Sequence, residues 1–132
     1  MASFARLASA LVPLALAAAP ALAEDTAGLM MTDWTLVSLD GAAFTARATL
    51  RLEEAGKLAG QAPCNRYFGQ VTGALPEFRP GAIGSTRMAC DELKLEGDYF
   101  TALQAVDRLT HSGAELHLSG GGHVLIFRRP AP

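Results

Sequence analysis

The chain has 132 residues, of which 11 are basic and 13 acidic, and a formal net charge of −2 with neutral histidines. This length fits one domain, and the basic residues are too scattered for the electrostatic footprint of a protein that binds nucleic acids or anionic membranes. Half of the residues are hydrophobic, but an alanine- and leucine-rich leader raises that share, so the rest of the chain is more polar than the average suggests.

The N-terminus has the layout of a secretory signal peptide. Arg6 precedes an uncharged stretch at residues 7–19, which is too short to cross a bilayer of about 30 Å, and small residues stand at the −3 and −1 positions of a cut after Ala23. A cut after Ala19 is the alternative, although a proline would then follow it. We therefore predict a cleaved signal peptide at residues 1–23 and a soluble periplasmic or secreted product. That product would have no membrane span once the leader is removed, and no lipid anchor, because no cysteine lies near the cut.

Short strands dominate the next part of the chain. We expect a flexible lead at residues 24–30, a folded domain at 31–129 and a tail at 130–132. Alternation of apolar and polar side chains predicts half-buried strands, the first of them with Trp34 as a core anchor. The predicted strands cover residues 34–39, 45–53 and 58–62, followed by an irregular segment at 63–69 and by short strands at Val71 and 75–78.

A change of period after Cys90 predicts one helix. Apolar residues recur there at steps of three and four, and an acidic first turn suits the helix dipole. Cys90 or Asp91 would cap this helix, and Gly97 would delay its start or bend it, because glycine costs about 1 kcal/mol relative to alanine. The helical face comprises Leu95, Tyr99, Ala102, Leu103 and Val106, and further strands follow at residues 109–111, 115–119 and 123–127. The predicted fold class is α+β, a mostly antiparallel sheet of about seven or eight short strands with one main helix packed on it.

Cys64 and Cys90 are the two cysteines of the chain. In an oxidising compartment an even count in a small domain predicts one structural disulfide, and closing a loop of this length would stabilise the fold by about 3.5 kcal/mol. The alternative is a thiol-dependent enzyme in which Cys64 or Cys90 acts with a histidine as a nucleophile of lowered pKa. The spacing of 26 residues lacks the close pairs of zinc ligands.

Three histidines raise the question of a metal site. His117 and His123 would share one face of a hairpin only if the glycine turn between them has three residues, because a shift of one residue turns every side chain to the other face. We therefore treat metal binding through His117 and His123 as the weaker alternative to solvated histidines. The sequence has no G-x-S-x-G or H-E-x-x-H motif, and the triple glycine precedes a strand, so no catalytic residue or cofactor is predicted.

Two motifs in order along the chain resemble a known family. The first is Cys64-Asn65-Arg66-Tyr67-Phe68-Gly69, preceded by Gly60; the second is Thr86-Arg87-Met88-Ala89-Cys90, followed by Glu96, Phe100 and Leu103. With the strand at residues 34–39, they make the chain similar to the META domain family, to which the bacterial heat-shock protein HslJ belongs. The resemblance covers nearly the whole chain after the leader.

The resemblance implies a compact curved sheet with a helix against it, in bacterial envelope proteins that often carry a lipoprotein signal. This sequence departs from that pattern in its ordinary signal peptide. The family is loosely linked to heat and envelope stress, and no enzymatic activity or cofactor defines it. We therefore expect a non-catalytic, monomeric and HslJ-like module that binds a periplasmic protein or an envelope component, or supports stability under stress.

The motif residues also allow a physical interpretation. Asn65 can bond local backbone in a turn, and Gly69 permits a left-handed or closely packed conformation. A disulfide would bring Arg66 and Arg87 near one another, either as a site for an anion or carboxylate or as stems that cover the core edge. In the second case their partners would be Asp91, Glu92 or Glu96, and Tyr67, Phe68 and Met88 would pack in the core or the loops.

Overall fold

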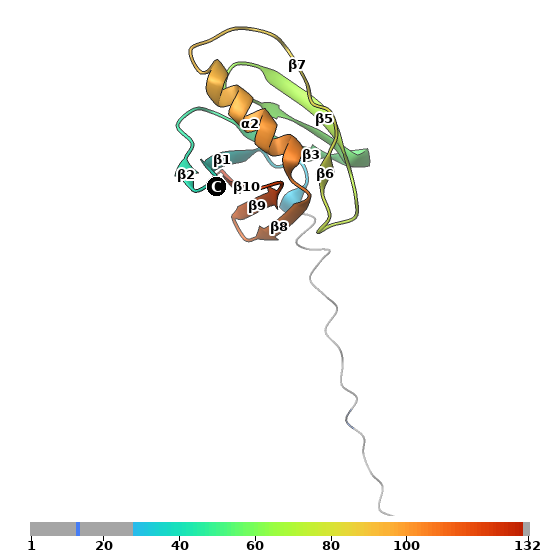
Figure 1. The fold of residues 1–132 in the computed structure, drawn as a ribbon. Coiled ribbons are helices and arrows are strands. Elements are labelled where there is room, and N and C mark those ends of the chain that lie inside the picture. Colours follow the sequence, from blue (N-terminus) through green and yellow to red (C-terminus); the bar gives the residue numbers. More distant parts are fainter. Residues whose placement is uncertain (1–12, 14–27, 131–132) are drawn as a thin grey trace, which may run out of the picture.

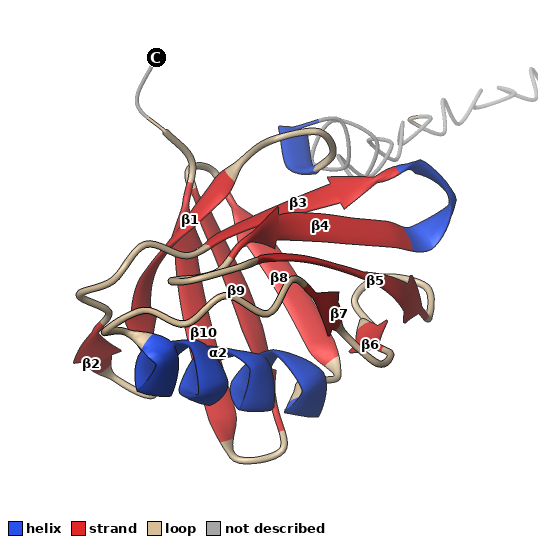
Figure 2. Cartoon of the chain, turned by 90° about the horizontal axis from the view of Figure 1, so that it is seen from above, coloured by secondary structure: helices blue, strands red, loops and turns tan. Residues whose placement is uncertain are grey.

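The computed structural model describes Pro13 and residues 28–130, so the predicted signal peptide lies outside the described residues except for Pro13, and its cleavage site lies outside them entirely. An antiparallel sheet curves around one helix, which crosses the open side of the sheet (Figures 1 and 2). The strands are β1 (Trp34–Leu39), β2 (Ala42–Ala43), β3 (Thr49–Glu53), β4 (Lys57–Gln61), β5 (Arg66–Thr72), β6 (Arg79–Pro80), β7 (Gly84–Ser85), β8 (Arg108–Ser112), β9 (Glu115–Gly120) and β10 (His123–Arg128); a 3₁₀ turn, η1 (Glu54–Gly56), joins β3 to β4, and the helix is α2 (Leu93–Ala105).

The two ends of the sheet meet. Its strand order is β6-β5-β4-β3-β1-β10-β9-β8, with β2 beside β1 and β7 beside β5. Beyond β8, Phe78 N donates to Asp107 O (3.0 Å) and Leu109 N donates to Pro76 O (2.8 Å), so the sheet is nearly closed into a barrel. The predicted α+β class with one main helix is confirmed. The ten strands exceed the predicted seven or eight because β2, β6 and β7 have only two residues each.

The core fills the space between the sheet and α2. Trp34 is fully buried, as predicted, and its Nε1 donates to Leu29 O (3.0 Å). Leu29 is itself only 2% exposed and belongs to the same cluster. The prediction of a flexible lead at residues 24–30 is therefore wrong at Leu29, because its side chain lies in the core and its main-chain oxygen accepts the indole N–H; residues 24–27 lie outside the described residues.

The predicted strand at residues 45–53 is wrong in its first half. Only Thr49–Glu53 is a strand, because β1 pairs with β3 through Trp34–Leu50 and Thr35–Thr49. The other end of β1 pairs with β2 instead, through Ser38–Ala43 and Leu39–Ala42. The predicted apolar face is still present in part, since Ala48, Leu50 and Leu52 are all buried.

The first family motif forms a regular strand. We expected an irregular segment at residues 63–69, but β5 starts at Arg66 and pairs with β4 from Gln61–Arg66 to Lys57–Gln70. Residues 75–78, predicted as a strand, form a turn and one isolated bridge, Glu77–Arg108. Pro63 and Asn65, just before β5, are residues typical of turns, and the outward residues of β5 are partly apolar. The local pattern therefore did not indicate a strand.

Helix α2 begins at Leu93, four residues before Gly97. Glu92 is the N-cap and makes no side-chain cap hydrogen bond, so the predicted caps, Cys90 and Asp91, are wrong. Gly97 lies inside the helix on an exposed face, where an added Cβ would have no neighbour within 4 Å. The first turn of the helix is held by the hydrogen bonds of Glu96, which are described below.

We predict that Gly97→Ala raises the free energy of unfolding by about 0.5–1 kcal/mol, because alanine lowers the entropy of the unfolded helix segment and meets no obstacle. Gly113→Ala is the matched control: its Cβ also meets nothing within 4 Å, but its φ of +58° is one that alanine adopts at a cost. Urea unfolding should therefore give changes of opposite sign. Equal signs in the two variants would contradict this assignment of the helix.

Candidate functional site

The disulfide joins the two family motifs. Cys64 stands just before β5 and Cys90 just before α2, and their Cα atoms are 5.7 Å apart. The described residues contain no free cysteine. Neither sulfur is therefore available as a thiolate nucleophile in this structure, and the thiol-dependent alternative would require the bond to be reduced.

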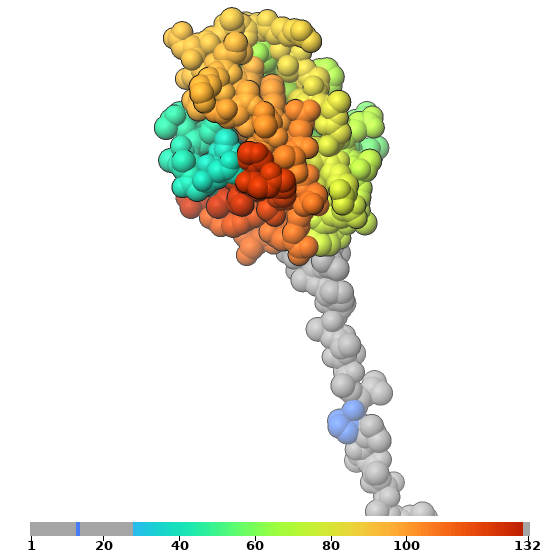
Figure 3. Space-filling model, in the orientation of Figure 1, coloured from blue at the N-terminus to red at the C-terminus, as the bar shows by residue number. Residues whose placement is uncertain are grey.

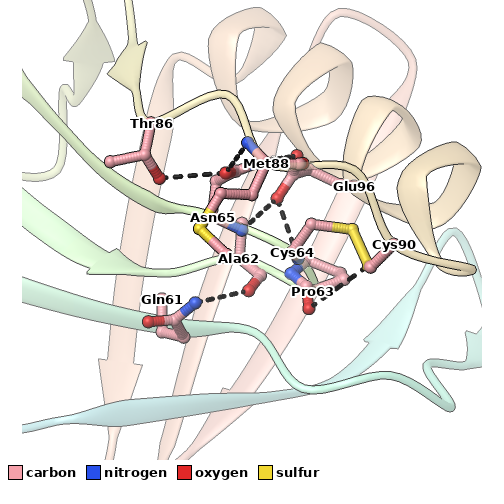
Figure 4. The surroundings of a disulfide bond; sticks show 9 residues. All are labelled: Gln61, Ala62, Pro63, Cys64, Asn65, Thr86, Met88, Cys90 and Glu96. Carbon is pink, nitrogen blue, oxygen red and sulfur yellow. Dashed lines mark hydrogen bonds between the residues drawn. A yellow bond between two sulfur atoms is a disulfide. The ribbon is translucent and has the colours of Figure 1, made fainter.

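Asn65 holds the second motif as a neighbouring strand would (Figure 4). Its Oδ1 accepts the N–H of Met88 (2.6 Å) and the hydroxyl of Thr86 (2.9 Å), while its Nδ2 donates to Met88 O (3.0 Å). Asn65 is 3% exposed. The carboxamide thus gives a peptide segment both the acceptor and the donor that a β-ladder would give it.

Glu96 completes this arrangement from the helix. Its Oε1 accepts the N–H groups of Cys64 (3.0 Å) and Asn65 (2.8 Å), and its Oε2 accepts Asn65 Nδ2 (2.7 Å). Glu96 is 4% exposed, so the carboxylate is buried and satisfied by three donors. We call Asn65, Glu96, Thr86 and Met88 the motif network; it ties β5, the second motif and α2 together.

The period of the helix in the sequence indicates the position of Glu96. Glu96, Tyr99 and Leu103 follow one another at steps of three and four, which places Glu96 on the buried face of the helix. An acidic residue on such a face needs buried donors. Its partners lie 31 or 32 residues earlier in the chain, and only the fold identifies them.

Two buried tyrosines form a second polar chain under the first motif. Tyr67 OH donates to Thr49 O (2.5 Å), so the contact of 2.6 Å between the two hydroxyls has Tyr99 as its donor. Gly60 allows this approach, because a Cβ there would lie 2.7 Å from Tyr67 OH and would also meet Thr49 O. Tyr67 is therefore a core residue, as predicted.

Burial raises the pKa of both tyrosines above 10, and the neighbouring Tyr99 adds to the effect at Tyr67. The unfolded chain loses these protons near pH 10 while the folded chain keeps them, so stability is complete below pH 10 and falls as the pH rises further. Each pH unit should then cost about 1.4 kcal/mol per tyrosine. These are the two tyrosines of the chain, so we predict that tyrosinate absorbance appears only together with the loss of native circular dichroism. A tyrosine that titrates while the fold persists would contradict the pair.

The two arginines of the motifs are exposed. Their segments are adjacent, since Thr86 N donates to Arg66 O (3.1 Å). Neither Arg66 nor Arg87 forms a salt bridge within residues 28–130, so the predicted pairing with Asp91, Glu92 or Glu96 is wrong there. Glu96 is turned to Asn65 instead, as described above.

The exposure of Phe68 and Met88 contradicts another prediction. We expected both in the core or in loop packing, but Phe68 is 62% and Met88 68% exposed. Phe68 alternates with buried Tyr67 along β5 and lies across Gly84 on the neighbouring strand, where a Cβ would be 2.6 Å from its ring. The network holds Met88 by its main chain and leaves the side chain free.

The histidines do not come together. The β9–β10 hairpin pairs His123 with Gly120, so its turn has two residues, and His117 pairs with Ile126 on the other face. His117 Nε2 contacts Glu115 (3.1 Å) and His123 Nδ1 contacts Asp40 (2.8 Å). The metal alternative through His117 and His123 is wrong for that reason.

Two shallow pockets flank α2. One, of about 330 Å³, lies between the β1–β2 turn and the helix and includes Asp40 and His123. The other, of about 380 Å³, has Asn65 and Glu96 beside it and is lined by residues 85–89 and by Leu93, Gly97 and Phe100. We call the second one the motif groove. It is mostly apolar and open to solvent.

No helix among the described residues has the length and hydrophobicity that crossing a bilayer requires.

Comparisons with known proteins agree with this geometry. The META domain pattern matches residues 27–132. The structure is similar to an NMR structure of a protein from Burkholderia xenovorans, with 29% identity, a TM-score of 0.65 and coverage of 83% of this chain and 88% of that one. A DUF4847 family protein from Bacteroides vulgatus shares the fold at 10% identity, with a TM-score of 0.59 and coverage of 76% and 93%. No curated protein matches the sequence. With a match over nearly all of the described residues, the chain belongs to the META domain family.

Proposed function

We propose that this chain is an exported, non-catalytic binding module that acts in the bacterial periplasm or outside the cell and supports tolerance of heat or envelope stress. Its partner is a protein or another envelope component. The leader of residues 1–23 supports export, and the disulfide is compatible with an oxidising compartment.

The motif network is the observation that carries the proposal. The polar groups that distinguish the two motifs, on Asn65, Thr86 and Glu96, are used in internal hydrogen bonds. They connect three parts of the fold, which is a structural role. Two apolar and two cationic side chains of the same motifs are exposed: Phe68, Met88, Arg66 and Arg87. Such a surface is suited to contact with a partner.

Site-specific photo-crosslinking in the exporting cell tests this proposal. We expect a photoreactive amino acid at Met88 to give a defined, saturable adduct with one envelope component, and more of it after heat shock. The same amino acid at Val124, an exposed apolar residue on β10, is the matched control and should give little adduct. Adducts of equal yield at both positions, or none at Met88, would argue against a binding role for this surface.

Export is tested in the same cells. We expect the protein in the periplasmic or secreted fraction, with Glu24 as its first residue by mass spectrometry. A protein that keeps its leader and stays in the cytoplasm would contradict the proposal before any partner is considered.

A further inference from the structure

We propose that the motif groove binds an extended peptide segment of another protein, one that alternates apolar and acidic side chains. This inference rests on the proposed function and names the class of partner. Figure 3 shows the segments that form the groove, coloured yellow to orange, together at the top of the molecule.

The main chain beside the groove has an open edge. The Asn65 side chain forms hydrogen bonds with both main-chain groups of Met88, and Arg66 O accepts the N–H of Thr86. In an extended segment the hydrogen-bonding groups of successive residues point in opposite directions. Those of Arg87 are therefore turned away from Asn65, and they make no hydrogen bond within the described part of the chain. A peptide strand can pair with this edge, as in β-augmentation.

The groove offers contacts for apolar side chains. Met88 and Leu93 line it and are 68% and 49% exposed. Gly97 leaves its floor open, because a Cβ there would meet nothing within 4 Å. The partly buried Phe100 lies further along the same helix face. A shallow open groove of this kind takes single side chains of a strand and does not enclose a small molecule.

The positive charge of Arg87 favours a carboxylate at the groove. Arg87 lines it and forms no salt bridge within residues 28–130, whereas the buried Glu96 at its base is occupied by three donors. A carboxylate of the peptide would give the guanidinium a charge-assisted partner. Arg66 is also exposed and unpaired among these residues, but it does not line the groove. Arg87 therefore lines the groove and Arg66 does not, although a shared site for both was one of the predictions.

The test uses the folded, disulfide-bonded protein and a synthetic octapeptide, capped at both ends, that alternates aspartate with valine or leucine. We expect micromolar to millimolar binding that weakens as salt is added. NMR shifts should concentrate at residues 85–89 and 93–100, and the Arg87 amide should gain protection from hydrogen exchange. A control peptide with lysine in place of each aspartate should bind at least about tenfold more weakly.

Three variants complete the design. Arg87→Glu should weaken binding by about tenfold or more, whereas Arg66→Glu, the same charge change outside the groove, should have a smaller effect. Gly97→Leu should weaken binding similarly by filling the floor, and it should fold because leucine is a good helix former at an exposed site.

The inference is overturned if the peptide does not bind at millimolar concentration, if the lysine peptide binds as well, if the shifts lie elsewhere, or if anionic lipid vesicles bind in its place. The crosslinking at Met88 is independent of these results. A single adduct there together with failure of the peptide would leave the binding role intact and refute only the class of partner.

Discussion

Glu96→Gln is expected to lower the free energy of unfolding by about 2–4 kcal/mol, although it changes only one atom of the side chain. The two carboxylate oxygens accept three N–H groups from Cys64 and Asn65. The amide nitrogen of glutamine must face one of those donors and can accept none of them. Asn65 cannot turn its oxygen towards it without losing the N–H of Met88 and the hydroxyl of Thr86. Loss of charge-assisted bonds and an unsatisfied buried donor add up to the stated cost.

Chemical denaturation measures this effect, and Glu54→Gln provides the matched control. Glu54 is exposed in the 3₁₀ turn between β3 and β4, and its side chain makes no hydrogen bond among the described residues. Its neutralisation should change stability by less than about 0.5 kcal/mol. Equal effects of the two substitutions would mean that Glu96 is not bonded as the structure shows.

Replacing both cysteines by serine is expected to cost about 3.5 kcal/mol, or a melting temperature roughly 15–25 °C lower. The disulfide closes a loop with a sequence separation of 26, which contains β5 and the second motif. Without it the unfolded chain gains entropy, while the motif network still defines the native contact. We therefore expect a less stable chain that folds to the same structure, as circular dichroism and the NMR spectrum can show.

Reductant supplies the control for this second prediction. It should lower the melting temperature of the wild-type protein by a similar amount and leave the serine variant unchanged. Thiol titration should find no free thiol in the unreduced protein, native or denatured, and two after reduction. Free thiols in the native wild-type protein would contradict the disulfide and would return the thiol-dependent alternative to consideration.

Local patterns in the sequence were enough to predict much of the fold. The strands β1 and β8 to β10 follow the period-2 alternation, and the helical face from Tyr99 to Leu103 follows the helical period. The Cys64–Cys90 pair was predicted from the even cysteine count in a chain for which export is also a prediction. The strands and the helix were predicted from patterns among neighbouring residues. The disulfide was predictable because two cysteines allow only one pairing.

Long-range pairing explains where the predictions failed. The first residues of β1 pair with β3 and its last residues pair with β2. No local signal at residues 45–48 indicates this change of partner. The position of Met88 depends on Asn65, which lies 23 residues earlier in the chain and binds its carbonyl oxygen. At the candidate site the family resemblance grouped the motif residues, but the part that Glu96 plays depends on contacts across 31 and 32 residues.

A double-mutant cycle between Asn65 and Glu96 tests most directly whether the family motifs form a structural network. The free energy of unfolding is measured for Asn65→Ala, Glu96→Ala, the double variant and the wild type. The network predicts strong coupling, with the double variant about 1–3 kcal/mol more stable than the sum of the single effects requires, because the second substitution removes donors or acceptors that the first has already left unpaired. Effects that add within about 0.5 kcal/mol would contradict the network and the structural role that we assign to these motifs.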